Sequence, residues 1–251
     1  MAVTTLTVLN KVLRGLRQYG LLIDAGTEVL TDDYLLMILQ FVNEAKEEIE
    51  EGGWAWEALR STVVITLAQG TQSYTLTSAG DADTDTNDRS RLLYENTQLQ
   101  SVGFRNSDSA LPLMFDVTTS TEFRLREITV ERFHRLKLTD DDEQGQPQYF
   151  AVQQQADNIQ LHIWPTPDKV YTLNGRFFIP QIELSDQTIT TTTLTIPHRP
   201  VWTRALFKAN QERGEELGKE GSALHRAMLD AHAAAVGNEQ SPADQTVFLE
   251  R

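Results

Sequence analysis

Carboxylates spaced two residues apart are the first candidates for chemistry in this sequence. They lie within residues 80–91, at Asp81, Asp83, Asp85 and Asp88. The spacing resembles the start of a calcium-binding EF-hand loop. However, Thr86 stands where that loop needs glycine, and Leu92 where it needs glutamate. We therefore interpret residues 80–91 as a solvated acidic loop and predict no metal site there.

Histidine and cysteine chemistry has little support. His225 and His232 share one predicted helix, but seven helical residues separate them by about 10 Å, too far for one metal ion without other ligands. The chain has no cysteine, which excludes disulfides, thiolate ligands and a cysteine nucleophile. The motifs GxSxG, GxxxxGK[ST], GxGxxG and HExxH are absent as well. We predict no enzyme activity, no cofactor and no metal.

The tryptophans leave one alternative function open. A β-sandwich carbohydrate-binding or glycan-cleaving protein could use them as a sugar platform and take paired carboxylates from the abundant Asp and Glu. The competing interpretation places most of them in a core where helices meet a sheet. The predicted helix–sheet joint consists of Trp54, Trp56 and Leu59, and the other two tryptophans are Trp164 and Trp202.

The net charge of the 251 residues is −14. Tight nucleic-acid binding draws on clustered Lys and Arg, so this balance argues against a surface that grips phosphates. It does not argue against a surface that DNA slides past, because an acidic wall repels the DNA backbone. No run approaches the ~18 apolar residues of a membrane span. The first residues also lack the layout of a secretion signal.

Three helices are predicted from the spacing of apolar residues. The first covers residues 4–19, with Thr4 or Thr5 as N-cap and Gly20 as C-cap. The second begins after Thr31 as N-cap, runs for about 20 residues, and has an apolar stripe wide enough to pack between other helices. The third covers residues 201–236 and ends at Gly237.

A β region is predicted between the second and third helices. Residues 63–76 should form a hairpin that turns at Gln69-Gly70. The Thr-rich run 188–195 should be an extended edge strand, because β-branched residues favour strands. A short helix is expected at 129–138. Further strands are expected at 92–104, 110–118, 123–128, 149–152, 158–164 and 171–179.

This order of elements predicts an α+β fold. The N-terminal helices and the C-terminal helix form a helical layer, and the centre forms an antiparallel β-sandwich or barrel-like domain. We expect a helical domain at 1–60 and 197–237, a β domain at 61–196, and an extended C-terminal tail at 238–251.

The tail carries three consecutive apolar residues, Val247, Phe248 and Leu249, on an otherwise polar segment. They fit either a frayed terminus or a docking peptide. Fully extended, its residues reach about 45 Å. Ordering them costs about 1–2 kcal/mol per residue, so docking would need backbone hydrogen bonds, such as strand addition, beside the apolar anchors.

Several short segments follow one another in an order that resembles a known family, the head-to-tail adaptor proteins of tailed bacteriophages, of the tail tubular protein A type. The segments span nearly the whole chain. They are the long second helix, Trp56-Glu57-Ala58-Leu59, residues 63–76 with GTQSYTL, residues 145–149 (GQPQY), residues 159–168 (IQLHIWPTPD), and Ile196-Pro197 before the last helix.

The resemblance implies a structural virion protein located in the neck and assembled in the host cytoplasm. Such adaptors form a homo-oligomeric ring, typically of twelve copies, beneath the portal protein. The helical layer and the C-terminal tail usually face the portal, and the β layer meets tail or nozzle proteins. Double-stranded DNA passes through the channel without sequence-specific binding. Under this reading, Val247, Phe248 and Leu249 are the portal-docking residues.

Overall fold

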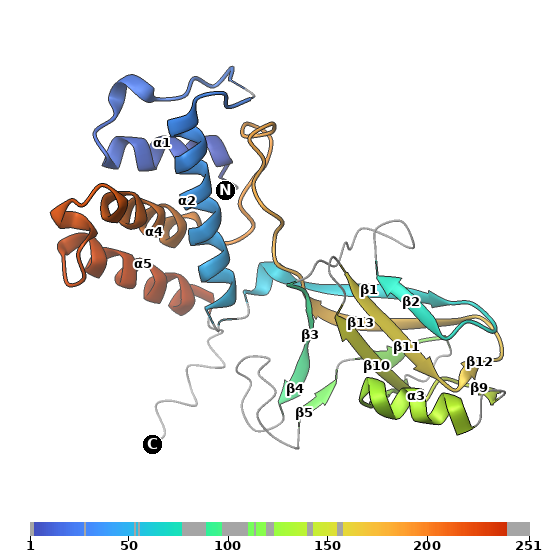
Figure 1. Cartoon of the computed structure of the whole chain (residues 1–251). Helices are drawn as coiled ribbons and strands as arrows, with labels where there is room; N and C mark the ends of the chain where they lie inside the picture. The colour runs from blue at the N-terminus through green and yellow to red at the C-terminus, as the bar shows by residue number, and fades with distance from the viewer. Residues whose placement is uncertain are drawn as a thin grey trace, which may run out of the picture. The chain divides into compact units, whose positions relative to one another are not determined.

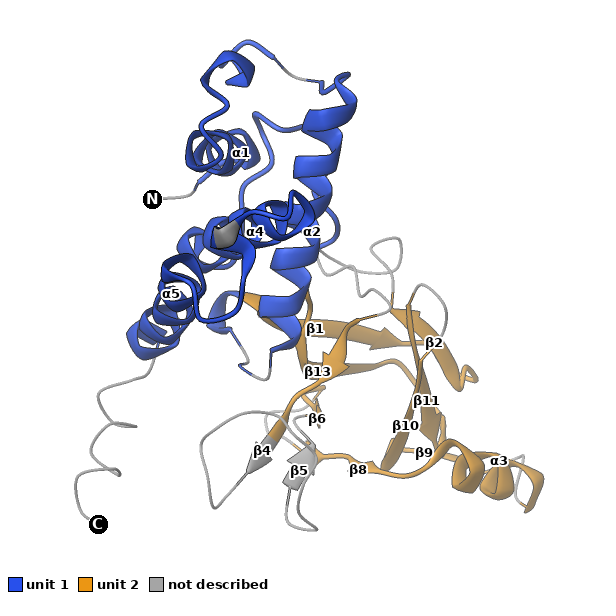
Figure 2. Ribbon diagram, turned by 60° about the vertical axis from the view of Figure 1, so that its left-hand side comes forward, with its two compact units in different colours: residues 1–58, 181–251 blue, residues 59–180 orange. Residues whose placement is uncertain are grey.

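The computed structural model describes residues 3–27, 29–52, 54, 56–76, 89–96, 110–112, 114–118, 123–139, 143–154 and 158–239. The chain divides into two compact units (Figure 2). A helical unit contains residues 1–58 and 181–251, and a β unit contains residues 59–180. The α+β class predicted from the sequence is confirmed. Residues 181–196, which we expected in the β domain, belong to the helical unit.

The helical unit is organised around its longest helix, α2 (Figure 1). This helix packs against α4 and, less extensively, against α1, while α4 also packs against α5. Short 3₁₀ turns connect the helices. The elements are α1 (Thr5–Gly15), η1 (Tyr19–Leu21), α2 (Asp33–Glu51), α4 (His198–Glu212), η3 (Glu216–Gly218) and α5 (Ala223–Glu239).

The cap of α2 lies one residue beyond the predicted one. The carboxylate of Asp32 accepts hydrogen bonds from the amides of Tyr34, at 2.9 Å, and Leu35, at 3.1 Å. Asp32 rather than Thr31 is therefore the N-cap, because a charged acceptor satisfies two free amides and complements the helix dipole. The buried face of α2 includes Ile38, Val42, Ala45 and Ile49, which confirms the predicted apolar stripe.

The first helix begins as predicted but ends early. The Thr4 hydroxyl accepts a hydrogen bond from the Thr7 amide, so Thr4 is the N-cap. The helix ends at Gly15 rather than near Gly20. Arg17 follows with a left-handed φ of 59°, while the Gln18 amide donates to the Leu13 carbonyl. A C-terminal turn of this kind usually employs glycine. Here an arginine occupies the left-handed position, and the helix ends before Gly20 is reached.

The predicted third helix is two helices, α4 and α5, separated by a tight turn around Gly218. A Cβ on Gly218 would lie 2.3 Å from the Gln211 nitrogen, so only glycine permits this approach of two backbone segments. Gly214 and Gly221 flank the turn with positive φ. α5 continues through Gly237, where we predicted its end, to Glu239.

The Thr-rich run is not a strand. Apart from one isolated bridge between Thr4 and Thr193, residues 188–195 form turns. The amides of Thr191 and Thr192 donate to the Thr188 carbonyl, and the Thr188 and Thr192 hydroxyls lie 2.7 Å apart. Local hydrogen bonds from threonine hydroxyls therefore outweigh the β propensity of the branched side chains.

The β unit is a sandwich of two sheets around one core, and its described strands form no closed barrel. One sheet has the order β1 (Arg60–Leu67), β13 (Tyr171–Phe178), β6 (Met114–Asp116) and β7 (Phe123–Arg124), with β3 (Arg91–Leu92) also paired to β13. The other has the order β2 (Ser73–Leu76), β11 (Ile159–Trp164), β10 (Tyr149–Gln154) and β8 (Arg126–Glu127). Two short pairs complete the unit: β4 (Tyr94–Asn96) with β5 (Ala110–Pro112), and β9 (Gln144–Gly145) with β12 (Thr166–Pro167).

The hairpin predicted at residues 63–76 is wrong in its pairing. The chain does turn at Gly70, whose φ is +77°. However, β1 pairs with β13 and β2 pairs with β11, so the two strands belong to different sheets. The Tyr74 hydroxyl donates to the carbonyls of Ala68 and Thr71 across this turn. The predicted short helix is confirmed as α3 (Val130–Thr139), which packs on β10 and β11.

Candidate functional site

A buried ion pair fixes the segment 181–186 along α2. The side chains of Lys46 and Glu50 are both 0% exposed. Lys46 Nζ donates to the carbonyls of Gln181, at 2.5 Å, and Ile182, at 2.9 Å, and lies 3.8 Å from a Glu50 oxygen. The other Glu50 oxygen accepts from the Gln181 amide at 3.3 Å. The pair thus supplies donors and acceptors to a stretch of backbone that lies outside the described strands.

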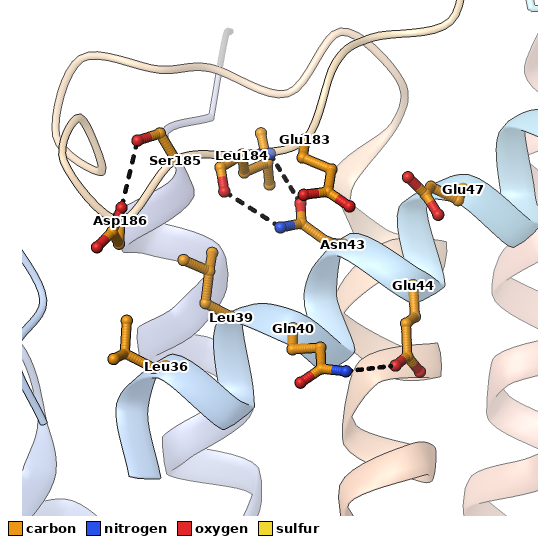
Figure 3. A pocket seen from close by; sticks show the side chains of 10 residues that line it. All are labelled: Leu36, Leu39, Gln40, Asn43, Glu44, Glu47, Glu183, Leu184, Ser185 and Asp186. Carbon is orange, nitrogen blue, oxygen red and sulfur yellow. Dashed lines mark hydrogen bonds between the residues drawn. The ribbon is translucent and has the colours of Figure 1, made fainter. Parts of the chain in front are cut away.

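Asn43 extends this attachment by one helical turn (Figure 3). Its side-chain amide donates to the Leu184 carbonyl at 3.1 Å, and its side-chain oxygen accepts from the Leu184 amide at 2.8 Å. The Leu30 amide donates to the Asp186 carbonyl. The segment is therefore held at several successive residues, which gives it a defined position beside α2.

Between α2 and this segment lies an open cavity of about 560 Å³, which we call the acidic groove. Leucines contribute apolar surface, and carboxylates from both walls contribute negative charge (Figure 3). Gln40 donates to Glu44 at 3.2 Å along one wall. The groove is lined by Leu36, Leu39, Gln40, Asn43, Glu44, Glu47, Glu183, Leu184, Ser185 and Asp186.

Ion pairs join α2 to α4. Lys208 Nζ lies 3.0 Å from Glu44 and 2.6 Å from Glu48, and Arg204 Nε lies 2.8 Å from the other Glu48 oxygen. Burial alone would lower the pKa of Lys208, but its hydrogen bonds to Glu48 and Glu44 raise the pKa above its ordinary value. These bonds orient Glu44 between Gln40 and Lys208.

A surface of opposite charge lies where α1 ends. Arg14 and Arg17 are exposed, and Tyr19 in the following turn is 65% exposed. We call these three residues the basic end of α1. Within the described part of the chain, neither arginine forms an ion pair.

The predicted joint residues lie in both units. Trp56 is fully buried in the helical unit, donates to the Ile49 carbonyl and contacts the His232 ring edge-on. Trp54 donates to Glu239 at 3.0 Å, and Leu59 is buried at the start of the β unit. Trp56 is thus a core residue, as is Trp164. Neither exposes the ring face that a sugar platform requires.

Comparison with known families bears on the function of this architecture. The family model described as SU10 adaptor protein matches residues 16–247, which include nearly all of both units. The chain belongs to the SU10 adaptor protein family. It is therefore a structural adaptor of a bacteriophage, with a place in the virion neck among portal and tail proteins. The narrower likeness to the tail tubular protein A type stays an expectation, and no curated protein matches the sequence.

Possible metal-ligand side chains do not gather at one place among the described residues. No group of three or more His, Asp or Glu side chains in that part of the chain could hold an ion. Its described helices include none long and apolar enough to cross a membrane. The aspartates at 81, 83, 85 and 88 lie outside the described residues. So do the tail residues Val247, Phe248 and Leu249.

One histidine of the β unit lies in a polar cluster beneath α3. His162 is buried in β11, with Nδ1 2.8 Å from the Ser73 hydroxyl and Nε2 3.0 Å from the Gln153 side-chain oxygen. Its ring stacks on Phe133 of α3 with centroids 4.8 Å apart. Ser73 and Gln153 are exposed polar neighbours, so the cluster is best explained as an attachment of α3 to the sheet.

This cluster predicts that the protein loses stability in mild acid. Burial lowers the pKa of His162, and the positive charges of His134 and Lys137 lower it further. The folded protein therefore binds a proton less readily than the unfolded chain. We expect full stability above the ordinary histidine pKa of 6.5 and a lower urea midpoint as pH falls below it.

The matched variant is His162→Gln, which has no titrating ring but keeps a donor and an acceptor. Urea unfolding at pH 7.5 and pH 5.5 should show a smaller difference in midpoint for this variant than for the wild-type adaptor. Equal differences in the two proteins would show that His162 does not contribute to the acid sensitivity.

The sequence alone identified neither Asn43 nor Lys46 as a functional residue. A signal for Lys46 was present, because it lies four residues after Val42 and three before Ile49, on the apolar face of the helix. A lysine in such a stripe indicates a buried partner. The groove itself had no local signal, because its second wall comes from residues about 140 positions further along the chain.

Proposed function

We propose that this adaptor forms a homo-oligomeric ring that joins the portal to the tail and surrounds the channel through which DNA leaves the capsid. The observation that carries the proposal is the family match over residues 16–247. The role is structural, and the protein acts through surfaces that it offers to its own copies and to neighbouring virion proteins. Twelve copies match the usual portal symmetry implied by the resemblance to head-to-tail adaptors.

In this proposal the helical unit faces the portal and the β unit faces the tail proteins. Residues beyond Glu239 are the docking segment. Glu239 accepts hydrogen bonds from the Trp54 indole and the Glu57 amide, so the segment starts from a fixed position. The net charge of −14 favours passage of DNA without adhesion.

Ring closure should depend on the portal. Contacts between copies need only be weak, because docking of many copies on one portal raises their effective concentration. We therefore expect the isolated protein to be monomeric or weakly associated in solution. Stable rings without portal would contradict this part of the proposal.

The test is electron microscopy and mass photometry of the purified protein with and without its portal. We expect ring-sized additions to the portal in the mixture. Absence of such complexes at high protein excess would refute the portal-adaptor function. Binding in an oligosaccharide screen would instead support the carbohydrate alternative.

A further inference from the structure

A ring of identical copies requires two different surfaces on each copy that fit one another, since a self-complementary surface gives only closed pairs. The helical unit carries two surfaces of opposite charge. One is the acidic groove beside α2, and the other is the basic end of α1.

The chemistry of the groove specifies what it can accept. Its leucines favour an apolar or aromatic group, and Glu183 and Asp186 on one wall favour a cation. Glu183 is exposed and Asp186 is half-buried. Asn43 fixes the backbone of this wall through its hydrogen bonds with Leu184. The backbone that carries the two carboxylates therefore has a defined position before a partner binds.

The basic end of α1 has this complementary composition. It presents two guanidinium groups and an aromatic ring within six residues of sequence. Arg17 also occupies a left-handed backbone position, which costs a residue with a side chain more than it costs glycine. Strain of this kind persists where the surrounding structure imposes it and is concentrated at functional sites.

The two surfaces lie towards opposite ends of α1. At its start, the Thr5 and Leu6 amides donate to the carbonyls of Thr192 and Ile189, in the segment that continues from the groove wall. At 1.5 Å per residue, the 11 residues of α1 place its C-terminal end about 16 Å from its N-terminal end. Figure 1 shows α1 running from this segment past α2 to the far side of the unit.

We propose that the basic end of α1 in one copy binds the acidic groove of the next copy. Tyr19 contacts the groove leucines, and Arg14 and Arg17 pair with Glu183 and Asp186. This inference rests on the proposed ring and specifies the contact that builds it. Because the paired charges are near the surface, a single contact is weak and sensitive to salt. This weakness explains why the ring would close only on the portal.

The first test exchanges the charges. Two double variants each place like charges opposite each other. One is Arg14→Glu with Arg17→Glu, and the other is Glu183→Arg with Asp186→Arg. Each should reduce ring formation on the portal at least tenfold. Combining all four substitutions restores complementarity and the wild-type net charge, so rings should return. Arg199→Glu with Arg226→Glu, at other exposed sites of the unit, is the charge-matched control and should leave rings intact.

Each other result overturns the proposal. If both reversals still give rings, the surfaces do not meet. If the fourfold variant forms no rings while the control does, the loss of rings has another cause than a contact between these two surfaces. One such cause is that the groove binds the portal.

The second test needs no portal and exploits the absence of native cysteine. Two single-cysteine variants, Tyr19→Cys and Glu183→Cys, are mixed at high concentration and oxidised. We expect a disulfide-linked heterodimer in excess of either homodimer, and a ladder of multimers when both cysteines are in one chain. No excess of heterodimer would refute the contact. If the heterodimer forms but no rings are found on the portal, the contact between copies is supported and the portal-adaptor function is refuted.

Discussion

Replacing Lys46 with methionine should destabilise the helical unit by about 3–5 kcal/mol, the usual cost of removing one member of a buried ion pair. The substitution keeps the length of the side chain but removes the Lys46 cation from the fully buried Glu50 carboxylate. It also removes the donor that satisfies the carbonyls of Gln181 and Ile182. The segment that forms one wall of the acidic groove should then detach from α2.

The measurement is urea unfolding followed by the circular dichroism of the helices. Arg226→Met, at an exposed position of the same unit, is the control and should change stability by no more than about 0.5 kcal/mol. The double variant Lys46→Met/Glu50→Leu removes both charges, so it should be more stable than Lys46→Met. A Lys46→Met protein as stable as wild type would show that the pair contributes nothing to folding.

The same residues explain which parts of the fold were predictable. α2 was evident because its apolar stripe, its acidic first turn and Gly52 are all local signals. The strands β10, β11 and β13 were likewise evident from alternation and from the turns between them. The pairing of β1 with β13 was not, because the partner lies more than a hundred residues away and alternation does not specify which strand lies alongside.

The predictions from sequence were wrong where hydrogen bonds or close contacts outweighed the secondary-structure propensity of the residues. Thr188 and its neighbours bond to one another and form turns in place of a strand. Gly218 permits a backbone approach that no helical pattern shows, so one predicted helix became two. The groove depends on Asn43 and Lys46 meeting residues 181–184, so its position could only follow from the folded structure.

Truncation of the docking segment should abolish association with the portal without unfolding the protein. Removing residues 240–251 keeps Glu239, whose hydrogen bonds to Trp54 and Glu57 close the end of α5. We expect unchanged urea unfolding and no ring on the portal. Truncated protein that binds the portal as tightly as the full chain would exclude a docking role for this segment.

A finer variant separates the apolar anchors from the rest of the segment. Phe248→Ala with Leu249→Ala removes side chains whose burial contributes about 1.5–3 kcal/mol each, so portal binding should weaken ~100-fold or more. Ser241→Ala with Gln245→Ala, in the same segment, should have little effect.

Because the charge reversals at Arg14 and Arg17 act between copies, they should leave the binding of a single copy to the portal unchanged. Loss of single-copy binding in the anchor variant, together with its retention in the charge-reversed one, would therefore separate portal docking from ring closure.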